Sequence, residues 1–500
     1  MRLYILEISR YALAAILAVY TLLAFQMLFR QKDESVQKVN GILQVLLILA
    51  FLGTGSLTVA AGFRDLRYLF LGALEILFLG GAIVLFHTIY DHANMLLYHN
   101  ACMLMSIGFV IISRFSLRRS AKQFSIALIG LILSLVLPLL RKKISRLKEP
   151  VFLYALGFAG VIALGIVLVL GSAIQGANLN YSIFGITFQP SEFVKILFVI
   201  FTAGCLSTTG KGWMSGLFAA AHVLILVFSR DLGSAVIFFV VYVLMLFEAT
   251  GKWWVLPAGA GSGAVGAYLG YRIFTHVQVR VQAFLDPWSV IDSMGYQITQ
   301  SLFAISFGGP FGTGLTQGAS ERIPYALEDF IFAPIAEELG LICAMCLILL
   351  CLNSFLLLLF MSLNYGDKFY QLCTFGIAAA YGFQNFLTIG GETKFIPLTG
   401  VTLPFVSYGG SSILATILMF TFAEMLAMLQ GEKIEAFRIR FEQEEEQRRE
   451  EEERRRRREE MQRRQQARLR RQQMRQNRPD RPEEGRPVRR SKKRPEEYED

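Results

Sequence analysis

The 500-residue chain is 54% hydrophobic and only 18% charged, with a formal net charge of +10. Soluble proteins carry about a quarter charged residues, so the composition excludes an ordinary soluble enzyme, and it excludes disordered, collagen-like and disulfide-stapled chains as well. The charges are also uneven, because 43 of the 88 formal charges lie in residues 431–500. A polytopic membrane protein with a charged tail is the class that remains.

Thirteen stretches of about 20 apolar residues are long enough to cross a bilayer as helices. The third is the weakest, because it contains Glu75 and ends at His87. The fold predicted is therefore an all-α polytopic membrane protein. Its spans lie near 11–29, 41–62, 68–88, 96–113, 123–140, 150–173, 191–207, 212–229, 232–249, 253–274, 336–361, 369–390 and 404–428.

The distribution of basic residues predicts the orientation of these spans. The 24 Lys and Arg residues of the tail follow the last span directly, which favours a cytoplasmic C-terminus. Counting spans backwards then places the loops 141–149 and 30–38 in the cytoplasm and the N-terminus outside. A basic cluster at 114–122 falls outside in this scheme and argues against it.

One long segment between spans, about 275–335, is predicted to lie outside the membrane. Connections above about 12 to 15 residues are usually functional or disordered, and this one is too rich in Phe and Ile for disorder. We expect a re-entrant or surface-lying structure over a cavity. Its glycine run, 308–314, could offer backbone amides to an anionic group or could form a turn between interfacial helices.

Acidic residues stand at the end of this segment. Asp329 directly precedes an apolar Phe-Ile-Phe stretch, where desolvation would raise its pKa towards that of a general base. The alternative is a surface or helix-capping carboxylate. Glu337 and Glu338 follow near a span, where unpaired carboxylates are costly; a helix-dipole role is the alternative.

Three further polar groups interrupt the apolar spans. Glu192 and Lys195 lie three residues apart on one predicted helix, where they could pair with each other or serve function. Arg230 and Asp231 separate two spans. The stretch 402–412 is rich in Gly and Ser, and close helix packing is its structural alternative.

The tail changes character along its length. From Glu432 to about Arg475 it contains Glu, Arg and Gln without Pro or Gly, which predicts a solvated single helix. Prolines after Arg478 predict disorder. Such a tail could contact anionic headgroups or dock a partner.

Taken in order, these motifs resemble the SEDS family (shape, elongation, division and sporulation; the FtsW/RodA/SpoVE group). The resemblance covers about 96–428 and implies a ten-helix core. It divides the chain into extra N-terminal spans at 1–95, a polymerase core at 96–430 and the tail at 431–500. The matching blocks are FQPSEFVKI at 188–196, DLGSA at 231–235, RVQAFLDPW at 280–288, GYQITQSLFAI at 295–305, GGPFGTGL at 308–315, DFIFA at 329–333, EELG at 337–340 and PLTGVTLPFVSYGGSS at 397–412.

This resemblance implies an inverting peptidoglycan glycosyltransferase that polymerises lipid II, an undecaprenyl-pyrophosphate-linked disaccharide pentapeptide. Asp329 matches the family's essential acid and would take the proton of the attacking sugar hydroxyl. Arg280, Lys195 and Lys394 are the cationic candidates for stabilising the leaving pyrophosphate, and a divalent cation, Mg or Mn, could assist. The remaining substrate-binding residues implied are Glu192, Asp231, Gln300, Ser301, Ser407, Gly409, Gly410 and Ser411.

The resemblance also implies partners and a location. We expect a class B penicillin-binding transpeptidase, other proteins of the division or elongation machinery, the bacterial cytoplasmic membrane, and no nucleic acid. Two alternatives remain open: a lipid II flippase, suggested by the Glu192 and Lys195 pair, and a non-catalytic scaffold acting through the tail. The sequence does not separate division from elongation or sporulation.

Overall fold

The computed structural model is built almost entirely of helices, which confirms the predicted fold class. A compact unit, Met1–Glu432, contains the helical body, and Lys433–Asp500 forms a second unit. The structure describes residues 2–31, 33–170, 172–174, 177–183, 186–208, 212–293 and 295–476.

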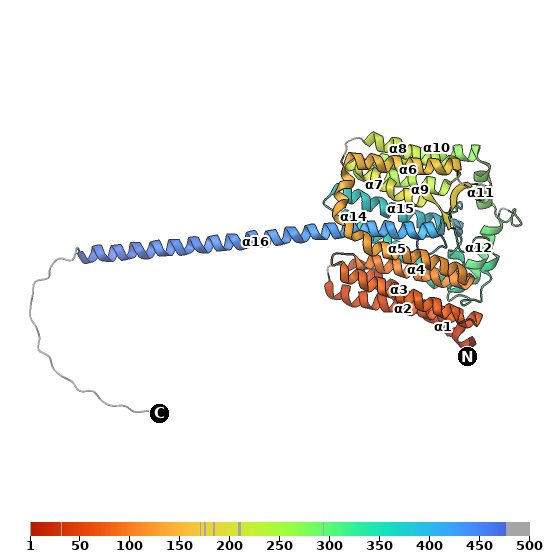
Figure 1. Ribbon diagram of the computed structural model, residues 1–500, viewed down its shortest axis with the longest axis horizontal. Helices are drawn as coiled ribbons and strands as arrows, with labels where there is room; N and C mark the ends of the chain where they lie inside the picture. The colour runs from red at the N-terminus through yellow and green to blue at the C-terminus, as the bar shows by residue number, and fades with distance from the viewer. Residues whose placement is uncertain are drawn as a thin grey trace, which may run out of the picture. The chain divides into compact units, whose positions relative to one another are not determined.

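Three helices precede the segment that resembles the SEDS core. They are α1 (Arg2–Phe29), α2 (Glu34–Phe63) and α3 (Arg67–Ile89). The carboxylate of Asp33 accepts the Val36 amide at 3.3 Å and so caps the start of α2. Helix α1 packs against α2 and α14, and α2 packs against α3 and α4, so the three helices form one edge of the body (Figure 1).

The next part of the chain forms helices joined by short connections. They are α4 (Met95–Phe115), α5 (Leu117–Val136), the 3₁₀ helix η1 (Leu137–Lys148) and α6 (Pro150–Leu170). A small antiparallel sheet of order β1-β2-β3 follows, made of β1 (Ser172–Ile174), β2 (Ala177–Ile183) and β3 (Ile186–Phe188). The apolar pattern of the sequence predicted no strands in this region, because the residues of the strands follow directly after the apolar run that forms α6.

The rest of the body is made of helices that follow the sheet in the chain. They are α7 (Pro190–Ser207), α8 (Gly212–Phe228), α9 (Leu232–Thr250), α10 (Val255–Ile273), α14 (Gly340–Leu363), α15 (Lys368–Glu392) and the start of α16 (Gly410–Gln476). Helix α15 packs against α7, α9 and α14, while α6, α8 and α10 lie at the edge opposite α1 (Figure 1).

Each of the thirteen predicted spans overlaps a helix. Eleven helices in the described residues are long and apolar enough to cross a membrane. Helix α8 is apolar but has only 17 residues, and the glycine-rich α10 is not among the eleven.

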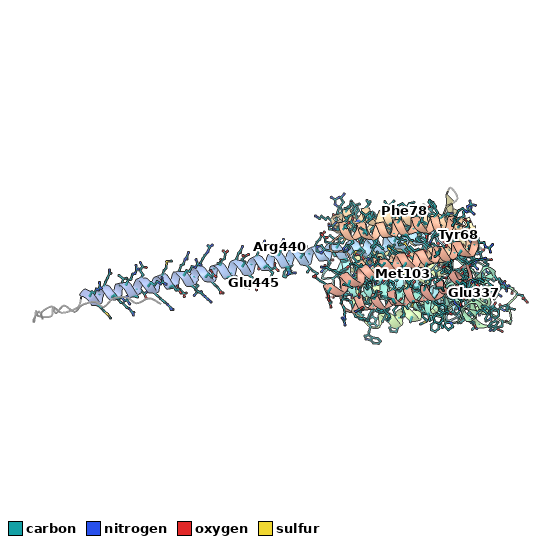
Figure 2. The ribbon with its side chains drawn as sticks, turned by 90° about the horizontal axis from the view of Figure 1, so that it is seen from below. Tyr68, Phe78, Met103, Glu337, Arg440 and Glu445 are labelled. Atoms are coloured by element: carbon teal, nitrogen blue, oxygen red, sulfur yellow. The ribbon has the colours of Figure 1, made fainter. Side chains whose placement is uncertain are left out.

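The long segment 275–335 is folded at one end of the body rather than extended. It forms α11 (Thr275–Leu285), α12 (Tyr296–Phe307), the short η2 (Ser320–Arg322) and the start of α13 (Phe332–Glu338). A small apolar cluster, which includes Ile298, Ile323 and Phe330, holds these pieces together. Helices α11 and α12 lie at this end in Figure 1, and Figure 2 shows Glu337 near it, with Met103 further inside the body.

The second unit continues α16 as a solvated helix to Gln476. Ion pairs four residues apart, such as Arg438–Glu442 at 2.9 Å and Arg455–Glu459 at 3.1 Å, stabilise it. Arg440 and Glu445 mark this helix in Figure 2. The disorder predicted after Arg478 lies outside the described residues.

Candidate active site

Asp329 lies in the turn immediately before α13, at the end of the body formed by segment 275–335. Its Oδ1 atom is buried and has no hydrogen-bond partner among the described residues. Burial raises the pKa of the Asp329 carboxyl to about 6; the Glu328 carboxylate adds to this rise and the Arg280 guanidinium opposes it. A carboxylate with a free oxygen and a pKa just below neutrality is suited to accepting a proton.

Asp329 opens into a cavity of about 230 Å³. Three other polar side chains line this cavity, those of Arg280 on α11, Gln297 on α12 and Tyr325. The rest of the lining is mostly apolar and includes Phe284, Ile298 and Leu398. A few convergent polar groups in an apolar setting are typical of a site that orients a ligand.

Because Gly400 has no side chain, the Asp329 carboxyl and the Arg280 guanidinium are both accessible from the same small space. A Cβ at this position would lie 3.5 Å from Arg280 Nη2 and 3.6 Å from Asp329 Oδ2. Its φ of +74° is one that residues with side chains rarely adopt. Arg280 Nη1 also donates to the Thr399 carbonyl at 3.0 Å, so the loop before α16 holds the cation in place.

A second polar cluster lies at the starts of α7 and α9 and contacts the loop before α16. Lys195 Nζ lies 3.0 Å from Glu192 Oε2 and 2.5 Å from Gln384 Oε1, and Gln384 donates to the Thr402 carbonyl at 2.9 Å. Asp231 caps α9 and accepts the Ser191 hydroxyl at 3.2 Å; burial raises its pKa. None of the acids and bases in this cluster lines the Asp329 cavity.

The candidates on α12 and α15 lie beside the cavity rather than in its lining. Ser301 donates to the Glu392 carbonyl at 3.1 Å. Gln300 is half-buried, but Gln297, one turn earlier, is the glutamine that reaches the cavity. Lys394 is half-buried with a φ of +57° and is not part of the lining.

The Gly- and Ser-rich stretch before and at the start of α16 is held by backbone contacts. Ser407 Oγ accepts the Leu403 amide at 2.9 Å, and Ser411 Oγ accepts the Gln189 amide at 2.9 Å. The Gly409 amide donates to Gln123 at 3.2 Å, and a Cβ on Gly410 would approach Ile126. These contacts match the close-packing interpretation of the stretch.

A buried carboxylate that the sequence analysis did not single out adjoins the cavity. Glu392 ends α15, next to the cavity-lining Gly391, and is fully buried. Its Oε2 accepts the Ala333 amide at 3.0 Å, whereas its Oε1 has no partner among the described residues. The signal in the sequence was a single acid between the apolar helix and the PLTGVT motif.

The backbone of the glycine run 308–314 forms hydrogen bonds with the backbone of α13. The amides of Thr313 and Gly314 donate to the Glu337 and Glu338 carbonyls at 2.8 and 3.0 Å. These two amides are already used, which favours the turn interpretation.

Glu338 forms an ion pair, and Glu337 accepts hydrogen bonds. Glu338 Oε1 lies 2.5 Å from Arg114 Nε, and Arg114 Nη1 lies 2.5 Å from Glu321. Glu337 accepts the Ala319 amide at 2.9 Å. Both acids end α13 and directly precede α14, so Glu338 is paired as predicted and the helix-dipole role at the N-terminus of the span stays open.

The matched family covers most of this body. Residues 93–431 match the model of the FtsW/RodA/SpoVE family, described as "Cell cycle protein". The chain belongs to this family. The resemblance drawn from the motifs is therefore confirmed, and the chain is a multi-pass membrane protein.

Individual relatives in the SEDS family carry enzyme names. The chain is 35% identical over 288 residues to "Peptidoglycan glycosyltransferase RodA" of Mycobacterium tuberculosis, covering 53% of this chain and 61% of that protein. It is 34% identical over 269 residues to "Probable peptidoglycan glycosyltransferase FtsW" of Aliivibrio salmonicida, covering 51% and 67%. The chain thus spans about three fifths of the mycobacterial relative.

Solved structures share the fold. One of them, described as "Structural coordination of polymerization and crosslinking by a peptidoglycan synthase complex", has a TM-score of 0.59 and 24% identity over 68% of this chain and 98% of that one. A mutant of the rod shape determining protein RodA of Thermus thermophilus has a TM-score of 0.52 and 23% identity over 68% and 98%.

A divalent cation, Mg or Mn, stays a prediction for this site, because such an ion is usually held by one or two carboxylates together with substrate phosphates. Among the described residues, no three His, Cys, Asp or Glu side chains are grouped so that they could hold a metal ion. Asp329 has the Arg280 guanidinium beside it, which supplies positive charge to the same space.

Proposed function

We propose that this SEDS protein is a peptidoglycan glycosyltransferase that polymerises lipid II at the outer face of the bacterial cytoplasmic membrane. The observation that carries the proposal is Asp329, whose buried Oδ1 is free to accept a proton in a cavity shared with Arg280. The names of the relatives support the same reaction class.

The reaction proceeds as a single displacement. Asp329 accepts the proton of the acceptor sugar's 4-hydroxyl as that oxygen attacks C1 of the donor sugar. The new C1–O4 bond forms as the bond from C1 to the lipid pyrophosphate breaks, so an α-linked donor gives a β-linked product. Arg280 stabilises the negative charge that develops on the departing pyrophosphate.

The other cations have different roles in this scheme. Lys195 is bound by Glu192 and Gln384, so we propose that it positions the 399–402 loop and does not contact phosphate. Lys394 lies outside the cavity lining and remains a candidate for a more distant contact with the lipid pyrophosphate.

The test is polymerisation of lipid II by the purified full-length protein, followed as glycan chains on a gel. Asp329→Asn should abolish the product, while Asp292→Asn, an exposed aspartate in the same segment, should leave it unchanged. Chains formed by Asp329→Asn at the wild-type rate would refute the assignment.

No observation favours transport over polymerisation. The Glu192 and Lys195 pair suggested a flippase, but Lys195 donates to both Glu192 and Gln384 and is therefore already bonded within the protein. Movement of lipid II across liposomes without polymer formation would support the flippase instead. A scaffold acting through the tail predicts that removing residues 433–500 displaces the protein from its site in the cell.

We also propose a transpeptidase partner and a cytoplasmic C-terminus. The matched peptidoglycan synthase complex is described as coordinating polymerization and crosslinking, and glycan strands must be cross-linked, so a class B penicillin-binding protein is the expected partner. Co-purification with that transpeptidase tests the partner, and a reporter active only in the cytoplasm, fused after Asp500, tests the orientation.

A further inference from the structure

A groove lies among the extra N-terminal helices, at the opposite end of the body from Asp329. It has a volume of about 640 Å³, within the range of about 300–1,000 Å³ found for small-molecule sites. The ends of α1 and α3 and the starts of α2 and α4 line it. Asn94, at the start of α4, donates its amide to Glu424 at 2.8 Å, which places the groove at the end of the body that contains Glu424.

The apolar side chains of the groove are exposed on the outer surface of the helices. Ile42 and Leu46 on α2 and Val84 on α3 line it and are 65%, 57% and 57% exposed. All three lie within helices that are long and apolar enough to span a membrane. In a bilayer, lipid acyl chains are the apolar groups that such an opening meets.

The polar part of the groove lies at the helix ends. Lys38 is in the second turn of α2, and His87 is in the last turn of α3. Both line the groove, as do His99 and Asn94, and the lining includes no carboxylate among the described residues. Among the described residues, the ion pair of Lys38 is a long, exposed contact with Glu34, at 3.9 Å, which is worth little in water.

Apolar walls that end in basic side chains fit an amphiphile with an anionic head. We propose that this groove binds one anionic phospholipid, with its phosphate at Lys38 and His87 and its acyl chains along Ile42, Leu46 and Val84. With the C-terminus in the cytoplasm as proposed, this end meets the cytoplasmic leaflet, whose surface is negatively charged. The site is separate from the glycosyltransferase cavity and does not depend on that activity.

Two variants test the two halves of the site independently. Lys38→Gln with His87→Gln removes the basic groups but keeps the space. Gly41→Leu fills the space but keeps the charges, and a Cβ at Gly41 meets only His99 Cε1, at an ordinary contact distance of 3.7 Å. Gly81→Leu is the matched control, because Gly81 on α3 is exposed, has nothing within 4 Å of its Cβ position and does not line the groove.

The experiment is native mass spectrometry of the full-length protein with phosphatidylglycerol or phosphatidylcholine added in detergent. Wild type should retain phosphatidylglycerol preferentially. The double charge variant should bind it about fivefold more weakly, the effect of one basic group at an anionic surface, with less change for phosphatidylcholine. Gly41→Leu should weaken both lipids, and Gly81→Leu neither.

Three outcomes would overturn the proposal. They are equal binding of the two lipids by wild type, unchanged phosphatidylglycerol binding in the double charge variant, and a lipid-free dimer in which a second copy covers the groove. Thermal unfolding of each variant shows whether it is folded. If Gly41→Leu fails to fold, the double charge variant alone still decides the question.

Discussion

Asp329→Asn should stabilise the protein while abolishing its activity. The carboxyl has a pKa of about 6 in the folded protein, raised by burial from 3.8. One pKa unit corresponds to about 1.4 kcal/mol, so keeping this group ionised costs the folded state up to about 3 kcal/mol at about pH 7.5. An amide of the same shape is uncharged and avoids this cost.

The direction of the pKa shift determines how the stability of the protein changes with pH. Between pH 3.8 and about 6 the folded protein holds a proton that the unfolded chain has released, so rising pH lowers the free energy of unfolding. The advantage of Asp329→Asn should therefore be greatest above about pH 7. It should fall to about 2 kcal/mol at about pH 5 and below about 1 kcal/mol at about pH 4, where the folded state is protonated and the unfolded chain is partly protonated.

The assay is thermal or denaturant unfolding of the purified protein at about pH 7.5, 5 and 4, the values that bracket the titration, with Asp292→Asn as the exposed control. A variant less stable than wild type at the highest of these pH values would refute the reasoning. A stability gain that is the same at all three pH values would refute it as well, because the gain would then not arise from the ionised carboxylate.

Three further predictions concern residues around this acid. Arg114→Leu leaves Glu338 buried without its cation and should lower the free energy of unfolding by about 3–5 kcal/mol; adding Glu338→Gln should recover part of that loss in the same melting assay. Glu328→Gln removes a like charge that raises the pKa of Asp329, so the acid limb of kcat/KM for lipid II polymerisation should move to lower pH, and an unmoved limb would contradict this. Gly400→Ala should cost about 1–2 kcal/mol of stability through its left-handed φ and lower the polymerisation rate by filling the space beside Asp329; a fully active variant would contradict the placement of the loop.

Local pattern was enough to predict the helices and the acid. The spans follow from runs of apolar residues, and Asp329 stands out because a charge beside Phe-Ile-Phe is expensive unless it has a use. The resemblance to the SEDS family, not local pattern, placed Arg280 among the candidate cations, and the structure brings it to the same cavity as Asp329.

Contacts between distant segments could not be predicted in this way. The Ala333 amide is paired with Glu392, 59 residues further on, and Gln384 reaches Lys195 across 189 residues. Nothing in the composition around Glu392 shows that its carboxylate turns towards the start of α13. Likewise, the spacing of Lys195 and Glu192 predicts that the two side chains pair. It does not predict that the side-chain amide of Gln384 also contacts Lys195.

The basic cluster at 114–122 argued against the predicted orientation, and its contacts limit the choices that remain. Arg114 pairs with Glu321 and Glu338, and Arg119 lies 3.7 Å from Glu328. The cluster therefore shares a membrane face with the segment that contains Asp329, whichever face that is.

Arg10 belongs to this face too, because it donates to the Gly312 carbonyl at 3.4 Å. Arg141 instead pairs with Glu432 at 2.5 Å, which puts the basic loop 141–149 on the face of the body that contains Glu432. Only two orientations remain. One of them places the 24 basic residues of the tail together with that loop in the cytoplasm, and the weight of basic residues favours it. The Asp329 cavity is then outside, on the face where the proposed polymerisation of lipid II takes place.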